Sequence, residues 1–260
     1  LRQGPAPERH LAKQIGFVMS AELSACGIDF SFTPVLDVDH GQSSVIGDRA
    51  FHRSSSAIAE LAHSLMIGLK LNGMPAVGKH FPGHGFIKAD THLELAIDHR
   101  IYQDIAMEDL IPFKQLIDFG ITGMMAAHVV YPNVDKHPAG FSSYWLKTIL
   151  RNELGFEGCI FSDDLSMKGT EGYGNIVDRT RISLEAGCDM VLVCNDSLSC
   201  DLLLDQLKWE TSAISLARLA RMRGRSHASS LIKLHEEASF VQAVNEIDQI
   251  GKDNLELSFT

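Results

Sequence analysis

The chain has 260 residues, of which 45% are hydrophobic and 22% charged. This length allows one large domain or two small ones, and the composition is that of a globular protein that can bury a core. The formal net charge of −10 argues against nucleic acid and an anionic membrane surface as partners. No apolar run approaches the roughly 20 residues that span a bilayer.

The cysteines and the first residues indicate a cytoplasmic protein. The five cysteines are odd in number and lack Cys-x-x-Cys spacing, so we expect free thiols in a reducing compartment. The start, Leu-Arg-Gln-Gly-Pro-Ala-Pro, has no hydrophobic signal core and no initiator methionine. The missing methionine is consistent with a fragment or a processed product. The cysteines are Cys26, Cys159, Cys188, Cys194 and Cys200.

The hydrophobic periodicity predicts helices and strands in alternation. Apolar residues at helical spacing, often closed by a glycine, predict helices over 8–26, 57–71, 105–119, 144–154 and 177–186. Short apolar runs predict strands over 30–38, 74–78, 121–127, 158–162 and 188–194. Residues 198 to about 244 are helical without a strand signal, and a polar tail is expected over 245–260.

This alternation predicts an α/β fold with a parallel sheet and crossover helices. Polar residues follow each predicted strand, as in a (β/α)₈ barrel, whose strand carboxyl ends share one rim. A doubly wound sheet also places ligands at strand ends, but no Gly-x-Gly-x-x-Gly follows a strand. Since a closed barrel needs eight strands, either three strands precede Leu1 or the sheet is open with five. The polar residues are Asp37, Asp39, Lys79, His80, His128, Asp163, Asp164 and Asn195.

One stretch, residues 79–92, is especially rich in ionisable side chains. It reads Lys-His-Phe-Pro-Gly-His-Gly-Phe-Ile-Lys-Ala-Asp-Thr-His, with two lysines, three histidines and an aspartate. Such a loop is a poor core but is suited to placing charges and proton donors around a bound polar molecule. Its first two residues are expected where the 74–78 strand ends.

Three of the acidic and histidine residues, Asp163, Asp90 and His92, allow more than one interpretation. Asp163, at a strand exit, can attack an electrophilic carbon, bind a cation, or simply cap a helix. Asp90 can accept a hydrogen bond from the His92 imidazole, which fixes its tautomer and favours the protonated form. Such a pair can serve as general acid and base, although an Asp-x-His in a loop is more often ordinary surface.

A metal site is a further possibility for the same loop. His80, His84, His92 and Asp90 have suitable ligand atoms, but the adjacent Lys79 disfavours a bound cation. Lys79, His80 and Arg49 are good donors to hydroxyl or amide oxygens. Arg49 can instead form a salt bridge with Asp48, and Lys88 is expected to be solvated.

Two motifs together resemble a known family. Residues 79–85, the Asp90-Thr91-His92 triplet and residues 161–167 (Phe-Ser-Asp-Asp-Leu-Ser-Met) closely resemble bacterial β-N-acetylglucosaminidases of glycoside hydrolase family 3, the NagZ-type enzymes of cell-wall recycling. Further matching segments lie over 34–38, 46–49, 127–129 and 186–190. The resemblance covers roughly residues 8 to 196 and is highly specific.

The resemblance implies a TIM barrel and a retaining hydrolysis of terminal β-linked N-acetylglucosamine. Asp163 matches the family nucleophile, which forms a covalent glycosyl-enzyme. His92 matches an unusual histidine acid/base, and Asp90 matches its dyad partner. An imidazolium suits this role because it does not repel the nucleophile as a second carboxylate would, and its loop can move between the two half-reactions.

The resemblance also implies the ligands. Arg49, Lys79 and His80 match sugar-binding positions, so the substrate is expected to be a muropeptide or chitooligosaccharide that contains N-acetylglucosamine. No cofactor and no metal are expected in this reaction, and neither nucleic acid nor a membrane is expected as a partner.

One family feature is not found. Family members begin with about three more strands and an Asp-Gln-Glu-Gly-Gly-Arg loop that grips the sugar, and nothing here matches it. We therefore expect an incomplete barrel of about five strands, with residues 1–244 as a single catalytic domain. The alternatives are a non-catalytic sugar-binding barrel and a metal-dependent barrel hydrolase. An incomplete barrel would also expose strand edges and favour self-association.

Overall fold

The centre of the protein is a parallel four-stranded sheet. The computed structural model describes residues 7–88, 96–225 and 230–250. The strand order is β1-β3-β6-β7, all parallel, with Val77 opposite Gly123 and Gly123 opposite Cys159. The predicted α/β fold with a parallel sheet is thus confirmed. The strands are β1 (Val77–Phe81), β3 (Gly123–Ala126), β6 (Cys159–Asp164) and β7 (Met190–Leu192).

The fifth predicted strand, 30–38, lies beside β1 but forms no regular ladder. Two isolated parallel bridges join Ser31 to Ala76 and Val35 to Lys79. The carbonyl of Pro34 accepts from the N–H of Lys79 at 3.1 Å, but proline has no N–H to return. The described residues therefore form an open sheet and not a closed barrel.

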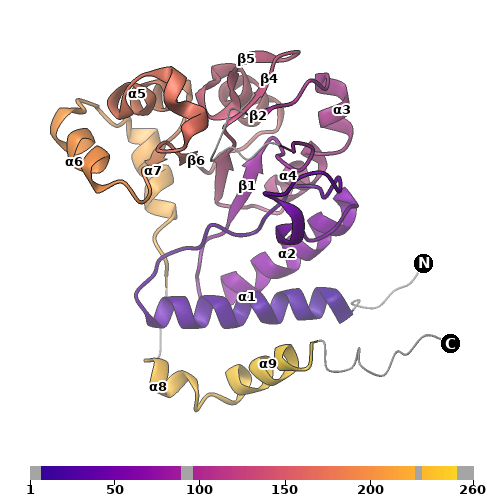
Figure 1. Ribbon diagram of the computed structural model, residues 1–260. Helices are drawn as coiled ribbons and strands as arrows, with labels where there is room; N and C mark the ends of the chain where they lie inside the picture. The colour runs from indigo at the N-terminus through magenta and orange to yellow at the C-terminus, as the bar shows by residue number, and fades with distance from the viewer. Residues whose placement is uncertain (1–6, 89–95, 226–229, 251–260) are drawn as a thin grey trace.

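Helices surround this sheet and precede each of its strands (Figure 1). The long helices α1 and α2 lie together at one side of the molecule, and α8 and α9 lie beyond α1 (Figure 1). The α-helices are α1 (Pro7–Ala25), α2 (Ser55–Leu71), α3 (Tyr102–Met107), α4 (Leu110–Asp118), α5 (Ile176–Ala186), α6 (Ser197–Gln206), α7 (Ala213–Arg221), α8 (Leu231–Leu234) and α9 (Ala238–Asp248). A π-helix, η3 (Tyr144–Glu153), and three 3₁₀ turns, η1 (Gly47–Arg49), η2 (Ala139–Phe141) and η4 (Lys168–Tyr173), complete the set.

Two expected helical boundaries are different in the structure. The single helix expected over 105–119 is two helices, α3 and α4. Pro112 lies in the first turn of α4, where proline is tolerated, whereas inside one long helix it would remove a hydrogen bond. The tail expected from Asn245 begins as helix, because α9 continues to Asp248 and Glu246 accepts hydrogen bonds from His10 and Gln14 of α1.

A second, smaller sheet was not predicted. It has three strands in the order β2-β4-β5, with β2 and β4 parallel and β4 and β5 antiparallel. These strands have two to four residues each, too few for a period of two to stand out in the sequence. They are β2 (Ala96–Ile97), β4 (Val129–Tyr131) and β5 (Asp135–Pro138).

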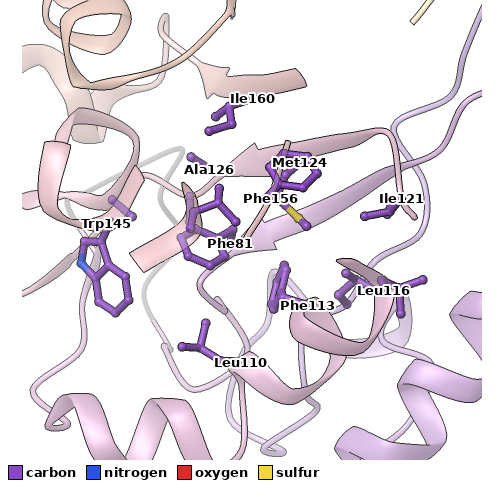
Figure 2. Packing of buried hydrophobic residues seen from close by; sticks show 14 of the residues in the cluster. Phe81, Leu110, Phe113, Leu116, Ile121, Met124, Ala126, Trp145, Phe156 and Ile160 are labelled. Atoms are coloured by element: carbon purple, nitrogen blue, oxygen red, sulfur yellow. The ribbon is translucent and has the colours of Figure 1, made fainter. Parts of the chain in front are cut away.

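The core lies on both faces of the main sheet. On the face toward α4 and η3, Phe81 packs edge-to-face against Phe113 and Trp145, with ring centroids 5.5 and 6.0 Å apart (Figure 2). On the opposite face, Met125 and Phe161 belong to a separate buried cluster. Neighbouring side chains of a strand thus point to opposite faces, as the pleat requires. None of the described helices is long and apolar enough to cross a bilayer.

Candidate active site

An irregularity in β1 places two neighbouring polar residues of this strand, Lys79 and His80, beside the same pocket. Val77 and Phe81 are four residues apart and would share a face of a regular strand, yet they belong to different buried clusters. The pairing register between β1 and β3 shifts between Lys79 and Phe81. A shift by one residue exchanges the faces beyond it, so both Lys79 and His80 line the pocket. Both residues lie within β1, not after its end as expected.

The pocket has a volume of about 300 Å³ and lies at the carboxyl ends of the main strands. Four of the six predicted site residues, Arg49, Lys79, His80 and Asp163, line it together. The other two, Asp90 and His92, lie outside the described residues. The remaining lining residues are Phe32, Val45, His84, Met125, Asp164, Met167, Leu192, Cys194 and Asn195.

Asp163 is a half-buried carboxylate that lines this pocket. One of its oxygens accepts a hydrogen bond from the N–H of Asp164 at 2.8 Å. Burial by itself raises the pKa of the Asp163 carboxyl, but His80, His128 and the Asp164 N–H together bring it below its usual value. A carboxylate held anionic inside a pocket is able to attack an electrophilic carbon.

The next residue, Asp164, supports the pocket wall. Its Oδ1 accepts hydrogen bonds from the backbone N–H groups of Ser166 and Cys194, both at 2.9 Å. Its Oδ2 accepts from the Ser166 hydroxyl at 2.7 Å. Asp164 therefore ties the end of β6 to the segment that follows β7, where Asn195 has a left-handed φ of 56°.

Two basic side chains, Arg49 and Lys79, line the pocket together with Asp163. Arg49 comes from the η1 turn, where its Nη1 donates to the Val45 carbonyl at 3.2 Å. Burial, followed by the nearby Arg49 guanidinium, lowers the pKa of Lys79, while Asp163 and Asp37 act in the opposite direction. This arrangement presents N–H donors and an anionic carboxylate to one small polar ligand.

His80 is held from behind by Asp37, a fully buried carboxylate from the 30–38 segment. The ring Nδ1 of His80 lies 2.7 Å from Asp37 Oδ2, and the His84 N–H donates to Oδ1 at 2.7 Å. Burial raises the pKa of Asp37, but His80 and His84 outweigh this effect and the net change is downward. The carboxylate is therefore anionic and acts as an acceptor.

His128 follows β3 behind the pocket. It is fully buried, and neither ring nitrogen has a hydrogen-bond partner among the described residues. Burial lowers the pKa of its imidazole, although Asp163 and Asp164 act against this. Its ring packs against that of Phe141, with centroids 5.2 Å apart.

Ligand atoms suitable for a metal occur elsewhere in the described part of the chain. His40, Glu108 and Asp109 have such atoms within 4.8 Å of one another. However, Arg100 Nη1 already lies 2.6 Å from Asp109 Oδ2, and a guanidinium on the same carboxylate disfavours a bound cation. The residues that the sequence offered for a metal include Asp90 and His92, outside the described ranges.

Sequence reasoning did not identify the apolar walls of the pocket or the supporting role of Asp37. Phe32, Met125 and Met167 have no polar signal in the sequence, and only their position in the fold brings them to the pocket. The sequence marks Asp37 as a polar residue at a strand end and within the matching segment 34–38, but gives it no role. Its distance of more than 40 positions from His80 hides the pairing.

Comparisons with known proteins identify relatives of this chain. Residues 3–222 match the family model described as the glycosyl hydrolase family 3 N terminal domain. The chain belongs to this family. A relative named β-hexosaminidase from Nitrosospira multiformis is 62% identical over 253 residues, which are 97% of this chain and 72% of that protein. Another β-hexosaminidase, from Nitrosomonas eutropha, is 58% identical over 98% of this chain and 74% of its own length.

Solved structures extend the comparison to the fold. NagZ from Neisseria gonorrhoeae, in complex with N-trifluoroacetyl-D-glucosamine, superposes with a TM-score of 0.85 and 46% identity. The match covers 92% of this chain and 69% of that one. The same NagZ has also been solved in complex with a zinc ion. The predicted family and enzyme class, a β-hexosaminidase of the NagZ type, are thereby confirmed, and so is the TIM-barrel-like fold, of which the described residues form an open part.

Proposed function

We propose that this protein is a retaining glycoside hydrolase that removes terminal β-linked N-acetylglucosamine from muropeptides during peptidoglycan recycling in the cytoplasm. The observation that carries the proposal is the meeting of Asp163, Arg49, Lys79 and His80 in one pocket. The β-hexosaminidase relatives and the glucosamine derivative bound by gonococcal NagZ support the choice of sugar. Residues 1–244 form the proposed catalytic domain.

In the proposed reaction, the Asp163 carboxylate attacks the anomeric carbon of the sugar. The bond from that carbon to the leaving oxygen breaks, and an ester between the sugar and Asp163 forms. His92, paired with Asp90, gives a proton to the leaving oxygen and later takes one from the water that hydrolyses the ester. The lowered pKa of Asp163 supports its role, because only the anion attacks.

The cations of the pocket are proposed to hold the sugar. Lys79 and Arg49 offer N–H donors to hydroxyl and acetamido oxygens, and His80 offers its ring nitrogen Nε2. Hydrogen bonds from charged donors to a neutral ligand are worth about 1.5–3 kcal/mol each. Loss of one of these residues is therefore expected to raise KM more than it lowers kcat, unless the contact strengthens in the transition state.

Asp163→Asn tests the nucleophile. The amide retains the shape of the side chain but cannot form the ester, so turnover of a chromogenic β-N-acetylglucosaminide should fall by at least about 10⁴-fold. A slow fluorinated sugar should label a peptide that contains Asp163 in the wild-type protein, as read by mass spectrometry. Asp178→Asn, on the α5 surface, is the matched control and should leave turnover unchanged. Label on Asp164 would refute the assignment.

His92→Ala tests the acid role. Cleavage of a dinitrophenyl glycoside needs no protonation of the leaving group, so this substrate should partly rescue the first step in the variant. If the variant loses turnover equally on substrates with good and with poor leaving groups, His92 has only a binding role. Addition of a chelator should leave wild-type turnover unchanged, whereas its loss would favour a metal-dependent hydrolase. Sugar binding without turnover, measured by calorimetry, would favour the non-catalytic alternative.

A further inference from the structure

Asp37 joins two segments of the chain through a single buried carboxylate. It accepts from the His80 backbone N–H at 3.3 Å on Oδ1 and 3.2 Å on Oδ2, and from the His84 backbone N–H at 2.7 Å on Oδ1. Its Oδ2 also lies 2.7 Å from Nδ1 of the His80 ring. Asp37 does not line the pocket, so any effect on a ligand must pass through the residues it holds.

This geometry decides which ring nitrogen of His80 carries a proton. An ionised carboxylate has no hydrogen to donate, so the short contact requires a proton on Nδ1. The other ring nitrogen, Nε2, then has no part in the contact with Asp37, and it belongs to a side chain that lines the pocket. A neutral His80 would thus accept a hydrogen bond at Nε2 from a sugar hydroxyl, and a doubly protonated His80 would donate one.

We propose that Asp37 is a positioning residue of the active site, which fixes the tautomer and orientation of the His80 imidazole toward the substrate. The effect on catalysis depends on the proposed function, but the tautomer does not. The competing explanation is that Asp37 serves only the fold, by satisfying the backbone N–H groups of His80 and His84.

Asp37→Asn separates these two explanations. An amide oxygen in the place of Oδ1 still accepts from both backbone N–H groups, so each keeps one acceptor, while the second contact of the His80 N–H, at 3.2 Å to Oδ2, is lost. The amide NH₂ in the place of Oδ2 is a donor, and it can face Nδ1 only if that nitrogen becomes the acceptor. The variant should therefore move the proton of a neutral His80 from Nδ1 to Nε2.

The primary measurement is the ¹⁵N NMR spectrum of the histidine rings in the full chain, assigned by comparison with His80→Gln. Wild-type His80 should have its neutral-state proton on Nδ1, and Asp37→Asn should move it to Nε2. A proton on Nε2 in the wild type would overturn the proposal without any variant. An unchanged tautomer in a folded Asp37→Asn would overturn it as well.

Kinetics provide the second measurement. Asp37→Asn should lower kcat/KM by roughly 10²-fold or more, as expected when a histidine is held in the wrong tautomer. Added to His80→Ala, it should cause less than about threefold further loss, because residues that act through one another are not additive. A full second loss in the double variant would mean that Asp37 serves the fold alone.

Asp189→Asn is the matched control. Asp189 is also a buried carboxylate that accepts from a backbone N–H, that of Ile160, at 2.9 Å, but it does not line the pocket. Its effect on kcat/KM, if any, should multiply with that of His80→Ala. If the wild type does not hydrolyse the chromogenic substrate, that result counts against the proposed function, and the NMR measurement still decides the role of Asp37.

Discussion

Arg100 shows how single residues hold the chain on both sides of residues 89–95. Its guanidinium lies 2.7 Å from Asp98 and 2.6 Å from Asp109, both with fully buried side chains. It also lies over the Phe86 ring, 4.1 Å from the centroid. The residue before the segment and the residues after it are therefore joined by charge and by a cation–π contact.

His40 shares Asp109 with Arg100 and makes stability depend on pH. His40 Nε2 lies 3.1 Å from Asp109 Oδ1. This hydrogen bond raises the pKa of His40 above 6.5, although partial burial acts against it. A raised pKa adds stability that is fully present below the unfolded-state pKa and is lost as the pH rises through the folded-state value. His40→Gln retains a donor but does not titrate. The difference in free energy of unfolding between the wild type and this variant should therefore shrink between about pH 6 and pH 8.

His63 provides a control of opposite sign. Its ring stacks on Phe119 with centroids 3.8 Å apart, and burial lowers its pKa. Its contribution to stability should therefore increase as the pH rises toward 6.5. Urea unfolding of the wild type, His40→Gln and His63→Gln at both pH values measures the two differences. The same pH trend in both variants would contradict the assignment.

At the scale of elements, long periodic segments were predictable and local irregularities were not. The helices over 8–26 and 57–71 have a strong period because each buries one face against the core, and the four strands of the main sheet stand out as short apolar runs because they are buried on both faces. The register shift in β1 has no sequence signal, since it follows from pairing with β3, and it exchanges the face of every residue beyond it. The sequence predicts Lys79 and His80 as site residues, although it places them after the strand and not within it.

The packing of α1 on α2 depends on two glycines. A Cβ on Gly68 would lie 2.1 Å from the Lys13 carbonyl oxygen, and one on Gly16 would lie 2.2 Å from that of Leu65. Alanine favours an isolated helix over glycine by about 1 kcal/mol, but here the two backbones would have to separate. Gly68→Ala should therefore lower the free energy of unfolding by about 1–3 kcal/mol, measured by denaturant titration.

Gly172→Ala is the control for this contact. Gly172 lies in the exposed η4 turn, and a Cβ there would meet no atom within 4 Å. Its free energy of unfolding should stay within about 0.5 kcal/mol of the wild type. If Gly68→Ala were as harmless as Gly172→Ala, the close approach of the two helices would be wrong.

At the scale of the whole molecule, the main sheet ends at β7. Among the described residues, β7 pairs with β6 and with no strand on its other side. Leu203 of α6 belongs to the buried cluster against which Val191 and Val193 pack, so α6 covers part of β7. Two leucines of α6 are open to solvent, with Leu198 80% and Leu204 77% exposed, and the exposed Asp201 and Asp205 lie between them on the helix surface. An unpaired strand edge beside exposed leucines is a surface on which another chain can pair.

We therefore expect the 260-residue chain to self-associate through the β7 and α6 side. Burying a leucine is worth about 1.5–3 kcal/mol, so Leu204→Lys should weaken association by at least about tenfold. Met107→Lys is the control, because Met107 is 78% exposed but lies on α3, at the other side of the molecule from α6 (Figure 1). Sedimentation velocity over a range of concentrations measures both variants. If the wild-type chain stays monomeric at about 100 µM, this edge does not bind a second copy. The same conclusion follows if Leu204→Lys and Met107→Lys weaken association equally.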